Sequence, residues 1–174
     1  KDLISHRFSI SEAEVAMRLL TGKEPTMGII LDFAGNNEPS EIERKIQLNN
    51  SKPTLTLFNE CNVGFLGAGN YAGRILMPAF KAAGANLNTV TSSGGVSAVH
   101  FGRKFEFREA ATDSNHLYDN SDINTVVVAT RHNAHSNQVL TALDHNKHIF
   151  CEKPLCLTLD ELEKIQNKSN SVSS

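Results

Sequence analysis

The chain lacks several features that would set it apart from ordinary globular proteins. No apolar run in its 174 residues approaches the roughly 20 residues of a membrane-spanning helix, and no signal peptide opens the sequence. The net charge is only −2, so nothing indicates a nucleic-acid or membrane partner. Three cysteines, Cys61, Cys151 and Cys156, are odd in number and lack the spacing of a zinc site. We therefore expect a cytoplasmic protein with reduced thiols and no metal, with room for one good-sized domain.

A glycine-rich segment organises the rest of the chain. Residues 63–66 read as a short buried strand, and Gly67-x-Gly69-x-x-Ala72 behind it fits the dinucleotide-binding fingerprint. Gly67 would allow a tight turn, Gly69 would leave bare backbone beside a pyrophosphate, and Ala72 with Gly73 would let the next helix pack close to the strand. The positive end of that helix would face the phosphates. Taken alone, the motif fits a purely structural turn equally well.

Strand and helix patterns alternate from residue 62 to 168. Strands are expected at 63–66, 87–91, 107–110, 125–129 and 148–151, and helices at 71–83, 96–104, around 117–118, at 134–145 and from 158. Pro78 predicts a kink in the first of these helices, and Thr158 with Glu161 forms a capping box before the last. The alternation predicts an α/β fold, a Rossmann-type doubly wound and mostly parallel sheet.

The first sixty residues carry weaker patterns. A capping box of Ser11 and Glu14 predicts a helix that ends at Gly22, residues 27–33 read as a buried strand, and Glu41–Leu48 fits a helix or a strand. One helix and one strand cannot bury a core, so we expect this part to dock on something else. The expected organisation is a tail at 1–40, a linker at 41–60, the dinucleotide-binding domain at 61–168 and a second tail at 169–174.

The chain lacks the acidic residue that an NAD site normally places about 20 residues past the glycine turn. The second strand ends in Ser92 and Ser93, and no Asp or Glu occurs between residues 61 and 105. That stretch does hold four basic residues, Arg74, Lys81, Arg103 and Lys104. Because no carboxylate would repel a 2′-phosphate, and two serines could hydrogen-bond it, we predict NADP in preference to NAD. The open alternative is that both serines cap the next helix and either cofactor binds.

Two segments directly after buried strands are candidates for chemistry, since function in this architecture sits at the carboxyl ends of the strands. One runs from Thr130 through His132 to His135, and the other is Glu152-Lys153-Pro154. A lysine beside a cofactor site is suited to proton transfer. The alternative is an exposed Glu–Lys pair before a turn. No carboxylate completes a metal set with the histidines, so surface histidines are favoured over ligands.

Three motifs in this order resemble those of the Gfo/Idh/MocA oxidoreductases, the group of glucose–fructose oxidoreductase and inositol dehydrogenase. They are Gly67-Ala68-Gly69-Asn70-Tyr71-Ala72, the Thr130–His135 run and Cys151-Glu152-Lys153-Pro154-Leu155. The resemblance implies the NAD(P)-binding domain of a dehydrogenase that transfers hydride between a sugar-like alcohol and nicotinamide, with Lys153 beside the reacting groups and Glu152 holding the cofactor. The site residues expected in all are Lys153 as catalytic residue and, for the cofactor, Gly67, Gly69, Asn70, Tyr71, Ala72, Ser92, Ser93, Thr130, His132, His135, Glu152, Lys153 and Pro154.

That family's substrate domain, an open antiparallel sheet, is expected just after the chain ends, so the chain is expected to be a piece of a longer polypeptide and inactive alone. Residues 2–8 and 28–32, with the helix between them, resemble the C-terminal end of medium-chain zinc alcohol dehydrogenases. An N-terminal extension packing on the main domain fits them equally well. The alternative function is a non-catalytic nucleotide sensor or scaffold. The substrate and the oligomeric state, including a homo-oligomer, stay open.

Overall fold

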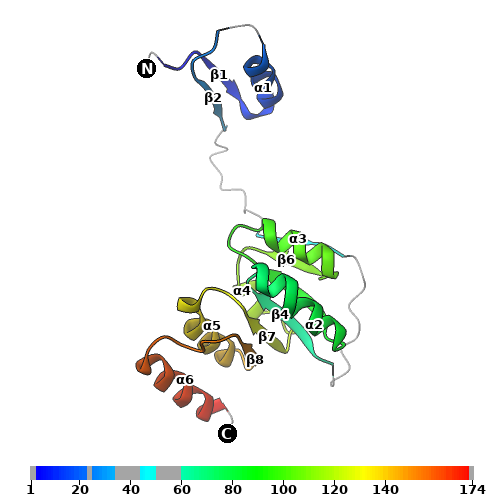
Figure 1. The fold of residues 1–174 in the computed structure, drawn as a ribbon, viewed down its shortest axis with the longest axis vertical. Coiled ribbons are helices and arrows are strands. Elements are labelled where there is room, and N and C mark those ends of the chain that lie inside the picture. Colours follow the sequence, from blue (N-terminus) through cyan, green and yellow to red (C-terminus); the bar gives the residue numbers. More distant parts are fainter. Residues whose placement is uncertain (1–2, 23–24, 34–43, 50–59, 173–174) are drawn as a thin grey trace. The chain divides into compact units, whose positions relative to one another are not determined.

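A six-stranded sheet forms the centre of the unit Glu43–Ser174 in the computed structural model (Figure 1), which describes residues 3–22, 25–33, 44–49 and 60–172. The strands lie in the order β3-β6-β5-β4-β7-β8. Their bounds are β3 Lys45–Gln47, β4 Asn62–Leu66, β5 Asn86–Thr91, β6 Glu109–Ala111, β7 Thr125–Val128 and β8 His148–Cys151. β3 pairs antiparallel with β6, and the other five described strands are parallel. This order, with β4 inside the sheet, confirms the predicted Rossmann-type α/β class.

Helices cover both faces of the sheet. They are the π-helical turn η2 Ala72–Leu76, α2 Met77–Ala82, α3 Val96–Phe105, α4 Asn115–Tyr118, α5 His132–Asp144 and α6 Leu159–Val172. Under η2, α2 and α3 lies one buried apolar cluster, which contains Phe65 and Val90. Under α4, α5 and α6 lies a second, which contains Leu66 and Val128. Phe65 and Leu66 are neighbours in β4 and enter different clusters, because successive side chains of a strand point to opposite faces.

The helix expected at 71–83 is not a uniform α-helix. The backbone N–H of Met77 bonds to the carbonyl of Ala72, five residues back, and α2 begins only with Met77. Pro78, the second residue of α2, has no N–H to donate to the turn before it. The irregularity expected at Pro78 is thus a wide turn just before it. Gly73 faces the ring of Phe101 in α3 rather than the strand, since a Cβ there would lie 2.3 Å from that ring.

Two other boundaries differ from the sequence pattern. The third strand starts at Glu109 instead of residue 107, because the N–H of Phe107 closes the end of α3 on the carbonyl of Gly102, after Glu106 turns left-handed with φ 65°. α5 starts at His132, two residues earlier than expected. The capping box of the last helix is confirmed: Thr158 N–H donates to Glu161 Oε2 and Glu161 N–H donates to Thr158 Oγ1, both at 3.2 Å.

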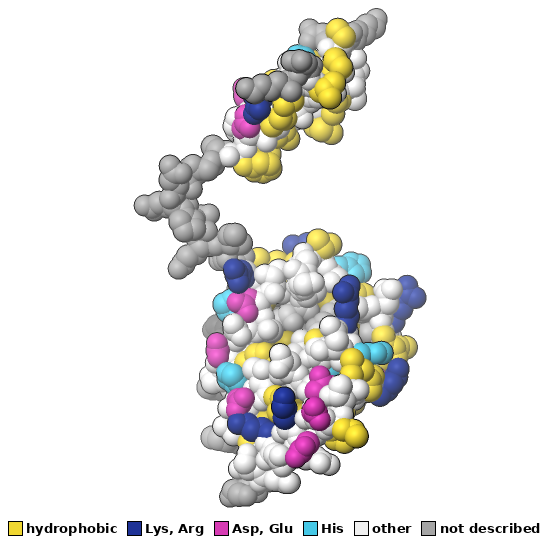
Figure 2. All heavy atoms as spheres, turned by 90° about the vertical axis from the view of Figure 1, so that its left-hand side faces the viewer, with side chains coloured by type: hydrophobic (Ala, Val, Ile, Leu, Met, Phe, Trp, Pro, Cys, Tyr) yellow, Lys and Arg dark blue, Asp and Glu magenta, His cyan; other side chains and the backbone are white. Residues whose placement is uncertain are grey.

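The unit Lys1–Ile42 contains β1 His6–Ser9, the 3₁₀ turn η1 Ile10–Glu12, α1 Ala13–Thr21 and β2 Ile29–Asp32, with β1 parallel to β2. The expected capping box of Ser11 and Glu14 is wrong. Ser9 and Glu12 form it, because the chain makes a 3₁₀ turn before α1. Ala16 is the single buried residue among those described in this unit, and Figure 2 shows several apolar side chains on the face of the unit that it draws.

Of the expected linker at 41–60, residues 44–49 and 60 belong to the described part of the chain, and residues 41–43 and 50–59 lie outside it. Within Glu41–Leu48 the strand alternative is the one found, as β3. No helix among the described residues is long and apolar enough to cross a membrane.

Candidate functional site

The glycine turn after β4 combines one glycine that the fold requires with one that it does not. Gly67 has φ +99°, and a Cβ on it would lie 2.5 Å from the carbonyl oxygen of Ala129 at the end of β7. A Cβ on Gly69 would meet no atom within 4 Å. Its missing side chain therefore leaves bare backbone facing open space, which is the surface that a diphosphate needs for close approach.

A pocket of about 650 Å³ opens over this turn, at the carboxyl ends of β4, β5 and β7. Gly67 and Gly69 line it together with Ser92 and Ser93 from the end of β5 and Thr130 from the end of β7. Its volume lies within the roughly 300–1,000 Å³ of small-molecule sites. None of the described residues that line it is acidic, so its walls hold no fixed negative charge to oppose a phosphate.

A smaller pocket of about 230 Å³ adjoins the first one. Tyr71, His132, His135, Glu152 and Lys153 line it, and Ala129 and Thr130 line both pockets. The two therefore meet at the end of β7. This places Lys153 and the glycine turn along one crevice, and Lys153 is exposed there.

His135 ties the two loops of this crevice together. Its side chain is 1% exposed, with Nδ1 2.8 Å from the carbonyl oxygen of Pro154 and Nε2 3.2 Å from that of Thr130. The Thr130 hydroxyl donates to Gln138 Oε1 at 2.6 Å. His135 thus connects the backbone at Thr130 to the backbone at Pro154, on either side of the smaller pocket. This contact positions the Lys153–Pro154 segment.

The serines at the end of β5 differ from each other. Ser92 Oγ accepts a hydrogen bond from the N–H of Ala98 at 3.2 Å, so it caps α3. Ser93 is exposed and forms no side-chain hydrogen bond with any residue that the structure describes. One serine therefore does what the capping alternative expected, and the other stays available to a ligand.

The remaining expected residues lie around these pockets. Asn70 lines a third pocket, and Ala72 is buried in the apolar cluster under α2. Pro154 contributes its carbonyl oxygen, which is the partner of His135 Nδ1. Sequence reasoning missed the contributions of Thr112, Ser114 and other polar residues to the larger pocket. Thr112 and Ser114 follow β6, so the rule that sites gather at the carboxyl ends of strands could have found them. The described residues hold no group of three or more His, Cys, Asp or Glu that could bind a metal ion.

Cys151, next to Glu152 at the end of β8, is not a ready nucleophile. Burial, with smaller contributions from the negative charges of Glu152 and Cys156, raises the pKa of its thiol to about 11. All three cysteines are free thiols. Because the thiolate is the reactive form, Cys151 stays protonated at neutral pH.

Comparison with known proteins decides the family. Residues 61–173 match the GFO_IDH_MocA family, described as an oxidoreductase family with an NAD-binding Rossmann fold. The chain belongs to this family.

Similar proteins include 1,5-anhydro-D-fructose reductase of Ensifer adhaerens, 26% identical over 102 residues that make up 59% of this chain and 31% of that protein. Levoglucosan dehydrogenase of Pseudarthrobacter phenanthrenivorans is 30% identical over 101 residues, 56% of this chain and 26% of that protein.

Solved structures agree in fold. Myo-inositol dehydrogenase from Lactobacillus casei, in complex with NAD(H) and myo-inositol, superposes with a TM-score of 0.61 at 30% identity, over 64% of this chain and 34% of that one. A 3-ketoreductase from Actinomadura kijaniata, in complex with NADP and TDP-benzene, has a TM-score of 0.61 at 23% identity, over 66% and 35% of the two chains, and shows the fold alone. The chain spans about a third of the length of these relatives.

Proposed function

We propose that this chain is the cofactor-binding part of a dehydrogenase or reductase that acts on a sugar-like alcohol. The observation that carries the proposal is the crevice itself, where bare backbone at Gly69 and the exposed Lys153 lie along connected pockets. Relatives named as sugar dehydrogenases and reductases support the substrate class. We place the substrate-selecting residues in a further domain outside this chain, and we expect the chain alone not to turn over.

The residues present fit a nicotinamide dinucleotide. The open space that a Cβ on Gly69 would fill suits the diphosphate, and the polar walls at Ser93 and Thr130 suit the riboses. When bound, the cofactor supplies or accepts the hydride. In our proposal Glu152 helps to hold it, and Lys153 positions or protonates the substrate oxygen, while His135 keeps the Lys153–Pro154 loop in place.

NADP is the preferred cofactor in this proposal. No acidic residue lines the larger pocket, so the group that normally accepts hydrogen bonds from the ribose hydroxyls of NAD is missing among its described walls. Ser93 is exposed at the place where that group would stand, and a serine hydroxyl can donate to a phosphate.

Two further parts of the proposal concern the rest of the molecule. In our proposal residues 1–40 are similar to the end of a medium-chain dehydrogenase, and the parallel pairing of β1 with β2 around α1 supports this. Three free thiols support a reducing, cytoplasmic location.

Titration of the chain with oxidised NADP and oxidised NAD, followed by calorimetry, tests the proposal. We expect both to bind, with NADP at least about tenfold tighter, which corresponds to about 1.4 kcal/mol. Tighter binding of NAD would refute the cofactor preference and leave the function standing. A folded chain that binds neither cofactor would refute the function itself.

A further inference from the structure

The histidine that connects the two loops of the crevice is bonded in an unusual way. All seven histidines belong to the described part of the chain, and His135 is the only one that is buried. Its Nδ1 lies 2.8 Å from the carbonyl oxygen of Pro154, and its Nε2 lies 3.2 Å from that of Thr130. A carbonyl oxygen accepts hydrogen bonds and donates none. Each ring nitrogen must therefore carry a hydrogen if both contacts are to be hydrogen bonds.

The number of ring hydrogens decides how many of these contacts His135 can make. The neutral imidazole has one N–H, whereas the imidazolium has two. The neutral ring can bond to Pro154 or to Thr130, and its other nitrogen then points a lone pair at a carbonyl oxygen. The protonated ring bonds to both, and hydrogen bonds from a charged donor are stronger than those from a neutral one. The geometry of the two loops therefore fits the imidazolium form of His135.

The surroundings of His135 contain charges of both signs. The titratable and charged side chains that line the pockets beside it are Tyr71, Arg131, His132, Glu152 and Lys153. Glu152 favours a positive ring, while Lys153, Arg131 and the positive end of α5 oppose it. His132, with its ring centre 5.7 Å away, opposes it when it is itself protonated. Both hydrogen-bond partners of His135 are neutral, so no bonded carboxylate holds the proton on the ring.

We propose that His135 is a proton-dependent positioning residue, whose imidazolium form holds the cofactor crevice in its binding geometry. The inference rests on the proposed function. When the ring loses a hydrogen at higher pH, it releases either Pro154, which adjoins Lys153, or Thr130, which lines both pockets. A buried carbonyl that faces a lone pair is unfavourable, so the released loop shifts until the carbonyl finds another donor. Nucleotide affinity is then full at low pH and falls as pH rises through the titration of His135.

Binding of oxidised NAD at two pH values tests this role. NAD is the probe because the 2′-phosphate of NADP itself titrates near about pH 6. We expect the unmodified chain to bind NAD about fivefold more weakly at about pH 8 than at about pH 5.5, the factor that the loss of one hydrogen bond produces. His135→Gln cannot gain a charge, so its affinity should stay the same within about twofold over this range. His116→Gln is the matched control, because His116 is exposed and lines none of the pockets described above, and it should keep the full change.

Nuclear magnetic resonance of the unmodified chain reports the ring of His135 directly. With ¹⁵N-labelled histidine and triple-resonance assignment, we expect two ring N–H signals from His135 at about pH 5.5 and one at about pH 8. A residue that only fills space would show the same number of ring hydrogens at both pH values. This measurement needs no variant, so it decides the protonation of His135 even if His135→Gln does not fold. Circular dichroism melting of each variant at both pH values shows whether the fold is kept.

The outcomes separate this inference from the proposed function. An unchanged number of ring hydrogens on His135, or an NAD affinity that does not change with pH, would overturn the inference alone. A change in affinity that survives His135→Gln and disappears in His132→Gln would belong to the neighbouring histidine and would also overturn it. A folded chain that binds NAD at neither pH would overturn the proposed function and the inference with it.

Discussion

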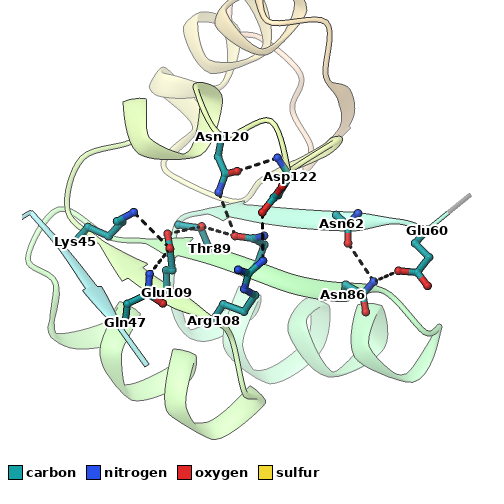
Figure 3. A network of polar contacts seen from close by, with 11 residues as sticks. Lys45, Gln47, Glu60, Asn62, Asn86, Thr89, Arg108, Glu109, Asn120 and Asp122 are labelled. Carbon is teal, nitrogen blue, oxygen red and sulfur yellow. Dashed lines mark hydrogen bonds and ion pairs between the residues drawn. The ribbon is translucent and has the colours of Figure 1, made fainter. Parts of the chain in front are cut away.

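The two ends of the central sheet are built from similar polar residues that are used in opposite ways. At the amino ends of the parallel strands, polar side chains bond to one another and to side chains of the antiparallel β3 (Figure 3). Glu109 is 7% exposed and accepts hydrogen bonds from Lys45, Gln47 and Thr89, which join β3, β6 and β5. At the carboxyl ends, the exposed groups such as Ser93 and Lys153 line pockets instead.

This difference shows where the chain keeps groups available for a ligand. No buried side-chain nitrogen or oxygen among the described residues lacks a hydrogen-bond partner, and at the amino end Asn86 bonds to both Glu60 and Asn62. Groups bonded in this way stabilise the sheet and have little capacity left for binding. Substitutions at the amino end should therefore lower stability, and substitutions at the carboxyl end should lower cofactor affinity unless they also disturb the backbone.

Gly67→Ala should be the strongest exception to this difference between the two ends of the sheet. Gly67 lies at the carboxyl end, but the fold also requires it. The new Cβ would occupy a left-handed conformation and lie 2.5 Å from the Ala129 carbonyl oxygen. Strain and overpacking together should lower the free energy of unfolding by about 3 kcal/mol and the melting temperature by more than about 10 °C. Thermal unfolding followed by circular dichroism measures this. An unchanged melting temperature would show that the turn can accommodate the Cβ beside the Ala129 carbonyl oxygen, contrary to this expectation.

Glu109→Ala should have the next largest effect, at the amino end. It removes the acceptor shared by Lys45, Gln47 and Thr89, and should lower the free energy of unfolding by about 2 kcal/mol. Glu109→Gln is the matched control, since it keeps the volume and one acceptor oxygen, and should lose about half as much. Hydrogen exchange should show faster exchange in β3 than in β4. Weaker cofactor binding without a loss of stability would contradict the division between the two ends.

The site at the carboxyl ends of the strands could be predicted from the sequence, because each of its motifs is a short run of neighbouring residues. The glycines, the strand ends at Ser93 and Thr130 and the Glu152–Lys153 pair all stand directly after recognisable strands, and the structure brings them to connected pockets. The polar contacts at the amino ends of the strands could not be predicted in this way. Glu109 lies 64 residues from Lys45, and nothing in the local pattern marks the two as partners.

The local errors have local physical causes. The pattern of Glu41–Leu48 fitted a helix or a strand. Its described part forms the strand β3 because it pairs with the edge strand β6. Ser9 with Glu12 and Ser11 with Glu14 match the same capping pattern, and only the 3₁₀ turn decides between them. The third-strand boundary moved because the Phe107 N–H closes α3. In each case a backbone hydrogen bond that the sequence does not record chose between two acceptable patterns.

Gly69→Ala should have the smallest effect on stability and the clearest effect on binding. No atom lies within 4 Å of the added Cβ, and the φ of Gly69 lies outside the left-handed region. An alanine that fits its site restricts the unfolded chain, so the free energy of unfolding should stay the same or rise by about 0.5 kcal/mol. The methyl group would nevertheless occupy the space proposed for the diphosphate and should weaken NADP binding about tenfold, a loss of about 1.4 kcal/mol. Chemical denaturation and calorimetric titration of the same sample measure the two quantities. Undiminished NADP affinity would move the diphosphate away from the glycine turn, and a large loss of stability would mean that Gly69, like Gly67, serves the fold.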